Sequence, residues 1–375
     1  MGLKTCTRPF TFLELQEDRV FSCCPAWIDD HDIGRYDSGA DIFEIWNSAE
    51  SQAIRASIFD GSFKFCSTKL CPRLHDPTTL DDEDDILAGR HGERLRNIYE
   101  NRRTVVSAPD YLNLCFDLSC NLSCPSCRKE LISVRKDHPK YEQKRRLEEQ
   151  LIESIHRSDQ PVRVSVTGSG DPFASRLFFD FLRRLDLNRN PNIVVTLQTN
   201  GVLFDEPHWR RLGNIHACKH IDAYISLDAG CEATYRQTRR GGNWTKLMRN
   251  LDFIARLRDS GVLKCVRLDM VVQDNNFRDI PDFIGIARQH DFHCELMRIV
   301  NWGTFDDEEF ARKNIFYLGH PEHPEFRRVM RSLAAYEKLS LGNLPEFVRP
   351  ESEARFHMPH WRDTIRDKRD PPPKS

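Results

Sequence analysis

The sequence predicts an α/β fold in which a partial (β/α)6 parallel barrel follows a small domain held by cysteine ligands. Two observations lead to this fold class. From residue 110 onward, short apolar stretches alternate six times with helical ones, as parallel strands do when right-handed crossovers join them. Cysteines gather near the N-terminus and directly after the first of these strands, as metal ligands do in proteins of reducing compartments.

The six strands are expected at 111–119, 161–172, 192–201, 221–230, 263–273 and 292–302, the second of them ending in a glycine-rich turn. Helix-forming residues and apolar stripes predict helices at 141–157, 173–185, 243–261 and 280–290, with a short helical piece that ends near Leu212. Gly261 marks the end of one helix and Pro281 the start of another.

Composition limits the function classes. Lys and Arg number 55 against 57 Asp and Glu, so the chain lacks the basic excess of nucleic-acid-binding proteins, and a nucleic-acid partner is not expected. No apolar run approaches the roughly 18 residues that span a bilayer, and the N-terminus has no apolar signal core. We therefore expect a cytoplasmic protein without a membrane partner.

Four segments are expected along the 375 residues. A cysteine-containing domain spans 1–77, and an acidic helical linker spans 78–109. The β/α core spans 110–310. A C-terminal helical extension with a loose tail, rich in proline and charge, spans 311–375.

Polar motifs follow four of the predicted strands. A cysteine run follows the first strand, Gly-Ser-Gly-Asp-Pro ends the second, Thr-Asn-Gly ends the third and Ser-Leu-Asp-Ala ends the fourth. Parallel sheets of α/β proteins carry their chemistry at the carboxyl ends of the strands. The sequence therefore predicts one functional site at this end of the sheet.

The cysteine run has the spacing C-x3-C-x2-C, at Cys120, Cys124 and Cys127. Cys115 lies within the preceding strand and is expected to point into the sheet. Structural zinc sites use four protein ligands, commonly as two pairs, and this spacing offers three. Three thiolates suit a four-iron cluster in which one iron stays open to a small molecule. Zinc bound by these cysteines is the alternative to an iron–sulfur cluster.

From about Tyr111 to Trp302 the chain resembles the radical S-adenosylmethionine (radical SAM) superfamily, because the C-x3-C-x2-C run and the strand-end motifs occur in its order. The resemblance implies that the three cysteines hold a [4Fe-4S] cluster. It also implies that S-adenosylmethionine is bound by Ser169, Gly170, Asp171, Pro172, Asn200, Ser226, Asp228 and Arg239. Two positions depart from the family pattern: Ser126 replaces a bulky residue, and Asp171 replaces the usual glutamate.

The N-terminal cysteines resemble the auxiliary-cluster domains called SPASM or twitch. Cys6 and Cys23 enclose the pattern C-x11-D-x4-C, in which Asp18 stands where those domains have glycine. The resemblance implies an auxiliary [4Fe-4S] cluster held by Cys6, Cys23, Cys66 and Cys71, in a domain that here precedes the barrel. Cys24 is an alternative to Cys23, and zinc held by the same four thiolates is an alternative to iron and sulfide.

The resemblance implies an oxidoreductase- or epimerase-type enzyme. Reductive cleavage of S-adenosylmethionine gives a 5′-deoxyadenosyl radical, which abstracts a hydrogen atom from an unidentified peptide, sugar or small molecule. A low-potential donor such as flavodoxin or ferredoxin would supply the electron. The auxiliary cluster would accept an electron, bind substrate or brace the fold.

Cys231 follows the fourth strand and is a candidate hydrogen-atom donor if the enzyme is an epimerase. Its alternative is a structural role at the following helix. A non-catalytic zinc or iron–sulfur module that contacts protein or RNA is the alternative to an enzyme. The placement of motifs on four strand ends favours the enzyme.

Overall fold

The computed structural model describes residues 3–36, 41–68, 70–75, 77–158, 160–166, 168–333 and 335–341. The chain divides into two compact units. Unit 1 consists of Met1–Ser119, Val134–Leu197 and Leu212–His220, and unit 2 of Cys120–Ser133, Gln198–Arg211 and the described residues from Ile221 onward. The loose tail expected at the end of segment 311–375 lies outside the described residues.

Unit 1 is built on strands in the order β8-β7-β6-β2-β3-β4. They are β2 (Phe12–Gln16), β3 (Arg19–Phe21), β4 (Gly34–Arg35), β6 (Tyr111–Cys115), β7 (Val162–Val166) and β8 (Ile193–Thr199). The pairs β2–β6, β6–β7 and β7–β8 are parallel, whereas β3 and β4 are added antiparallel beyond β2. The sequence pattern predicts β6, β7 and β8, but not β2.

The two faces of this sheet differ in polarity. One face buries rows of aliphatic side chains, among them Leu13, Leu112 and Val164, which stand level with one another on β2, β6 and β7. The other face carries a row of polar side chains at matching register, namely Glu14, Asn113, Ser165 and Thr196. Because side chains alternate along a strand, apolar and polar residues alternate in the sequence.

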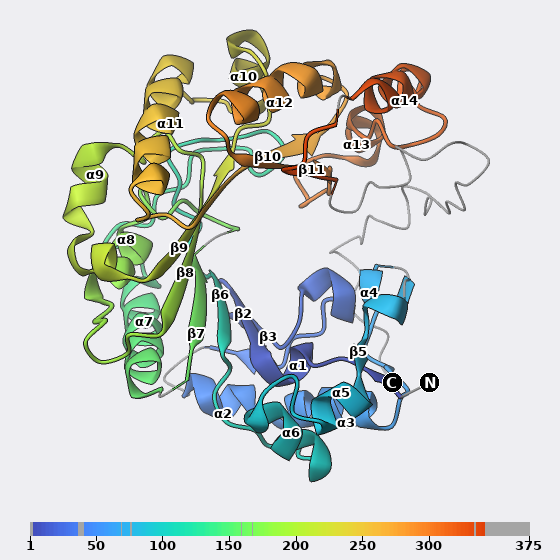
Figure 1. The fold of residues 1–375 in the computed structure, drawn as a ribbon, viewed down its shortest axis with the longest axis vertical. Coiled ribbons are helices and arrows are strands. Elements are labelled where there is room, and N and C mark those ends of the chain that lie inside the picture. The colour runs from blue at the N-terminus through green and yellow to red at the C-terminus, as the bar shows by residue number, and fades with distance from the viewer. Residues whose placement is uncertain are drawn as a thin grey trace. The chain divides into compact units, whose positions relative to one another are not determined.

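The helices of unit 1 are α1 (Arg8–Thr11), α2 (Ile42–Trp46), α3 (Ala49–Phe59), α4 (Pro72–His75), α5 (Glu83–Leu87), α6 (Glu93–Glu100), α7 (Tyr141–Arg157) and α8 (Arg176–Arg184). In Figure 1, α2, α3, α5 and α6 lie together beneath β2 and β3. A separate two-stranded sheet joins β1 (Lys4–Thr5) to β5 (Asp81–Asp82). Helices α5 and α6 fall within segment 78–109, and the four segment boundaries stay predictions.

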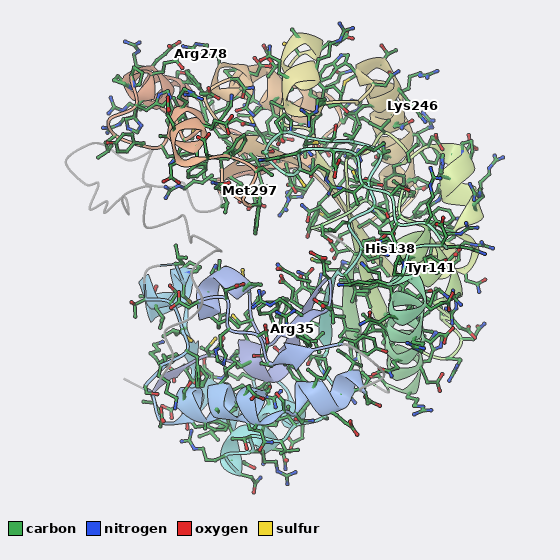
Figure 2. All side chains as sticks on the ribbon, turned by 180° about the vertical axis from the view of Figure 1, so that it is seen from behind. Arg35, His138, Tyr141, Lys246, Arg278 and Met297 are labelled. Carbon is green, nitrogen blue, oxygen red and sulfur yellow. The ribbon has the colours of Figure 1, made fainter. Side chains whose placement is uncertain are left out.

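Unit 2 has strands in the order β12-β11-β10-β9, each parallel to its neighbour. They are β9 (His220–Ser226), β10 (Cys265–Val272), β11 (His293–Arg298) and β12 (Leu339–Ser340). The helices are α9 (Glu206–Arg211), α10 (Glu232–Thr238), α11 (Trp244–Asp259), α12 (Ile280–Gln289), α13 (Asp307–Lys313) and α14 (His323–Ser332). Figure 1 shows α10, α11 and α12 on one side of β10, and Met297 on β11 points away from them in Figure 2.

The predicted α/β class is confirmed, because six mostly parallel strands, β6 to β11, alternate with helices in the expected order. The helix expected at 141–157 is α7, and Asn243 caps α11 by accepting from the Lys246 amide at 2.8 Å. In the described part of the chain, no helix is both long and apolar enough to cross a membrane.

Arg55 on α3 is a fully buried charge that joins separate segments of unit 1. Its guanidinium donates to the carbonyl oxygens of Pro9 (2.9 Å), Trp46 (2.9 Å) and Thr104 (2.7 Å). It also donates to Asn47 Oδ1 at 3.0 Å and lies 4.3 Å from the ring centroid of Trp46. Burial lowers the pKa of Arg55 to about 9, so the group is charged at neutral pH.

Replacing Arg55 with Met is expected to lower the free energy of unfolding by about 3 kcal/mol, because two buried carbonyl groups and one part-buried carbonyl group lose their donor. Urea denaturation followed by circular dichroism measures the change. Arg35→Met is the matched control, since the side chain of Arg35 on β4 (Figure 2) is 57% exposed. This substitution should leave the free energy of unfolding nearly unchanged. Equal losses in the two variants would contradict the role of Arg55.

Candidate functional site

The C-x3-C-x2-C loop of unit 2 is fixed by backbone hydrogen bonds. The Cys120 amide donates to Ile132 O at 3.0 Å, and the Ser123 amide donates to Arg240 O at 3.0 Å. The Cys127 amide donates to Cys124 O at 3.0 Å, which forms a tight turn. Cys124 is buried, Cys120 is half-buried and Cys127 is exposed. The three thiols therefore sit on an ordered loop that is partly open to solvent.

Each of the three sulfur atoms accepts a hydrogen bond. Cys120 Sγ accepts from the Leu122 amide at 3.4 Å and from Asn200 Nδ2 at 3.7 Å. The other two sulfurs accept from guanidinium groups: Cys127 Sγ from Arg128 at 3.4 Å and Cys124 Sγ from Arg239 at 3.8 Å. Donors of this kind stabilise thiolates, which are the form of cysteine that binds metals.

Arg239 forms a buried ion pair next to Cys124. Its NH2 lies 2.8 Å from Asp228 Oδ2, and Asp228 Oδ1 accepts from the Val271 amide at 2.7 Å. Burial raises the pKa of the Cys124 thiol, and the Arg239 charge opposes that rise. Within the described residues, Arg239 Nε is buried without a hydrogen-bond partner. This orphaned donor fits a ligand that offers an acceptor beside the cysteine loop.

The remaining predicted residues of unit 2 occupy the ends of strands and helices. Asn200 is buried after β8, and its Nδ2 donates to Asn121 Oδ1 on the cysteine loop at 2.9 Å. Ser226 is half-buried at the end of β9. Cys231 is the N-cap residue of α10, with Sγ 3.5 Å from Thr234 Oγ1. The structure thus brings Asn200 and Arg239 to the cysteine loop through hydrogen bonds, pairs Asp228 with Arg239, and places Cys231 at the helix start.

The glycine-rich turn belongs to unit 1 and packs on the backbone that follows β6. A Cβ atom on Gly170 would lie 2.5 Å from Asp117 O and 2.7 Å from Ser119 O, so only glycine fits there. Ser169 Oγ donates to Cys115 O at 2.6 Å, and the Asp171 amide donates to Ser119 O at 2.9 Å. The turn is therefore held against the residues that immediately precede Cys120 in the chain.

Asp171 has a structural function in this turn. Its side chain is 1% exposed, and its Oδ1 accepts from the Phe173 and Ala174 amides at 2.9 and 3.2 Å. Pro172 follows it and is also buried. The carboxylate of Asp171 thus stabilises the turn through local backbone bonds. Its predicted role in binding a cofactor stays a prediction.

The four N-terminal cysteines meet in unit 1 although they come from four separate segments. Cys6 follows β1, Cys23 follows β3, Cys66 follows α3 and Cys71 precedes α4. All four line one small cavity. The other lining residues are apolar or basic: Arg8, Pro9, Trp27, Ile28, Ile58, Phe63, Arg73, Leu74 and Leu80. Cys24 is not among the described residues that line this cavity, which favours Cys23 as the ligand.

Burial and mutual repulsion raise the pKa values of the thiols in this group. Burial raises the pKa of Cys23 well above its usual range, and Cys6, Cys24 and Cys66 raise it further. Burial, Cys6 and Cys71 together raise the pKa of Cys66 to about 12. Neighbouring thiolates would repel one another in this apolar space, so the thiols stay protonated unless a cation binds them.

Four thiolates match the ligand number of a four-iron cluster and equally that of a structural zinc site. In the described part of the chain, no group of three or more His, Cys, Asp or Glu side chains could hold a metal ion as placed. In a four-iron cluster each thiolate binds its own iron, so the sulfurs need not converge on one point. Within the described residues, Arg8 Nε is buried at the four-cysteine cavity without a hydrogen-bond partner, which fits an additional acceptor there.

Sequence reasoning named Arg239 but missed three other arginines at the cysteine groups. Arg8 and Arg73 follow Cys6 and Cys71 by two residues, in a repeated C-x-R pattern, and Arg128 directly follows Cys127. These spacings are visible in the sequence. Their meaning depends on side-chain directions that spacing alone does not give.

Comparison with known proteins gives the family of one segment. The family model of the radical SAM superfamily matches residues 118–286. Native anSMEcpe with bound AdoMet and Cp18Cys peptide is 20% identical over 49% of this chain and 49% of that chain, with a TM-score of 0.36. Streptococcus suis SuiB bound to precursor peptide SuiA is 15% identical over 69% of this chain and 55% of that chain, with a TM-score of 0.40.

The chain spans about half the length of the solved structures it matches. No curated protein has a significant match to the sequence. The segment matched by the family model includes all three cysteines of the C-x3-C-x2-C loop. The chain therefore contains, at residues 118–286, a domain of the radical SAM superfamily of enzymes.

Proposed function

We propose that the protein cleaves S-adenosylmethionine reductively and abstracts a hydrogen atom from an unidentified peptide, sugar or small molecule. The radical SAM domain implies a [4Fe-4S] cluster and S-adenosylmethionine. When bound, these cofactors supply a 5′-deoxyadenosyl radical as the abstracting species. The observation that carries the proposal is that each sulfur of Cys120, Cys124 and Cys127 accepts a hydrogen bond from an N–H group.

The protein's part in this function is to hold and orient. Cys120, Cys124 and Cys127 would each bind one iron, which leaves a fourth iron without a protein thiolate. Arg239 would offer its buried Nε–H to an acceptor of the cofactor, while Asp228 fixes the guanidinium from the other side. Both effects arise from groups that are already ordered, so little reorganisation is needed on binding.

The residues proposed to bind S-adenosylmethionine come from the strand-end motifs: Ser169, Gly170, Asp171, Pro172, Asn200, Ser226, Asp228 and Arg239. Gly170 contributes by the absence of a side chain, since its backbone lies against Asp117 O and Ser119 O. Asp171 contributes by shaping the turn. A cytoplasmic location is proposed, where a flavodoxin or ferredoxin would supply the low-potential electron.

An auxiliary [4Fe-4S] cluster is proposed in the N-terminal SPASM- or twitch-like segment, bound by Cys6, Cys23, Cys66 and Cys71. The shared cavity and the orphaned Arg8 Nε–H support it. Four thiolates complete the coordination of a four-iron cluster. Zinc held by the same residues is the alternative, and a metal-binding module for protein or RNA contacts is the alternative for the whole chain.

Replacing Cys120, Cys124 and Cys127 together with Ala is expected to reduce 5′-deoxyadenosine formation to background, because the chain then lacks thiolates for the catalytic cluster. Chromatography of dithionite-reduced, anaerobically reconstituted protein measures this product. Cys265→Ala is the control, since Cys265 is half-buried at the start of β10 and has no assigned role. Product formation that survives the triple replacement would overturn the assignment of the site.

Replacing Cys66 or Cys71 with Ala is expected to lower the iron content from about eight to about four atoms per chain, as the loss of one four-iron cluster requires. Formation of 5′-deoxyadenosine should persist. Cys23→Ala is expected to behave in the same way, whereas Cys24→Ala should retain the iron because Cys24 does not line the cavity. Zinc in the unmodified protein, with iron unchanged in these variants, would establish the zinc alternative.

Cys231 is proposed as the hydrogen-atom donor of an epimerase. It is half-buried, and Sγ lies 3.5 Å from Thr234 Oγ1. If Cys231 donates, the product formed in deuterated water carries solvent deuterium, and Cys231→Ala abolishes the label while substrate consumption continues. Mass spectrometry of the product measures both. A two-electron-oxidised product without label would instead assign Cys231 a structural role at α10.

A further inference from the structure

Two arginines are the basic residues among the described walls of the four-cysteine cavity. Arg8 lies two residues after Cys6, and Arg73 lies two residues after Cys71. Apart from the cysteines, the other described residues that line the cavity are apolar. These two guanidinium groups are the positive charges among the described residues that line the cavity, and Arg73 is also paired with Asp81.

Arg73 makes a direct hydrogen bond to the cysteine group. Its NH1 donates to Cys6 Sγ at 3.7 Å and to Asp81 Oδ2 at 2.9 Å. The carboxylate of Asp81 is itself fixed, because it accepts from the Thr7 amide at 2.9 Å and from Thr7 Oγ1 at 2.8 Å. The position of the Arg73 donor is thus set by groups outside the cavity.

Arg8 is held in a different way. Its guanidinium lies 3.7 Å from the ring centroid of Phe12 and 5.0 Å from that of Trp27. These cation–π contacts restrict its position. Within the described residues its Nε is buried without a partner. Arg8 is among the residues that line the cavity, so this buried and unused donor is available to an acceptor bound there.

Both arginines would act on the redox equilibrium of a bound cluster. Four thiolates around an oxidised four-iron core carry a net charge of about −2, and one-electron reduction makes it about −3. Apolar walls make the added charge costly. Cations and N–H donors to sulfur oppose that cost, so they raise the reduction potential.

We propose that Arg8 and Arg73 raise the reduction potential of a cluster bound by the four N-terminal cysteines. The inference rests on the proposed auxiliary cluster. One-electron reduction of such a cluster would add one electron and break no bond.

The test uses the full chain with Cys120, Cys124 and Cys127 replaced by Ala, so that the remaining iron reports on the N-terminal centre. The midpoint potential is measured by dithionite titration with electron paramagnetic resonance. Arg73→Gln is expected to lower the equilibrium constant for reduction about tenfold, which is about 59 mV for a one-electron couple. Arg8→Gln is expected to lower it as well, and Arg35→Gln, at an exposed position on β4, should leave it unchanged.

An unchanged midpoint in both Arg73→Gln and Arg8→Gln, with about four irons per chain retained, would overturn the inference and leave the auxiliary cluster in place. If Arg73→Gln does not retain iron, Arg8→Gln carries the test, and a parent-like midpoint in that variant overturns the inference. Failure of the proposed function gives a different result, since the parent protein with intact arginines would then contain no iron at this site.

Discussion

The parallel pairing of β2 with β6 is the constraint on which the arrangement of unit 1 depends. It sets Phe12 beside Tyr111 and Gln16 beside Cys115, so an N-terminal segment joins a sheet whose other parallel strands begin only at Tyr111. The segment that carries Cys6 and Arg8 leads into β2, and the antiparallel β3 ends two residues before Cys23. The pairing of β2 with β6 and β3 therefore helps to position the two segments that carry Cys6 and Cys23.

The two cysteine groups meet the same electrostatic requirement with similar means. Thiolates in partly buried surroundings need compensating charge, because desolvation penalises the ionised sulfur. In unit 2, Arg128 and Arg239 donate to sulfur, and Arg73 does so in unit 1. Arginine suits this role, since its charge persists on burial and its donors can serve two partners at once. Asp228 and Asp81 hold two of these groups and so orient them toward sulfur.

The predicted strands β6 to β11 were accessible from the sequence because apolar and polar residues alternate and helical stretches separate them. Strand β2 is not predicted from the sequence, because FLELQ is short and no helical stretch directly follows it. It also lies between Cys6 and Cys23, which the sequence assigns to a metal-binding segment. Spacing could group Cys6, Cys66 and Cys71 with Cys23 or Cys24, but it could not choose between two adjacent residues. That choice depends on which side chain faces the cavity, and the same limit hid the roles of Arg8 and Arg73.

Ligand number explains why the two cysteine groups differ in their surroundings. Three thiolates leave one position of a four-iron cluster for a small molecule, and Cys127 of that group is exposed on its loop. Four thiolates would leave no such position, and the N-terminal group lies among apolar side chains and two arginines, with Cys23 and Cys71 buried. Under the proposed assignment, the open centre would need access for a cofactor, whereas the closed centre would not. The exposure of Cys127 and the burial of Cys23 and Cys71 agree with this difference.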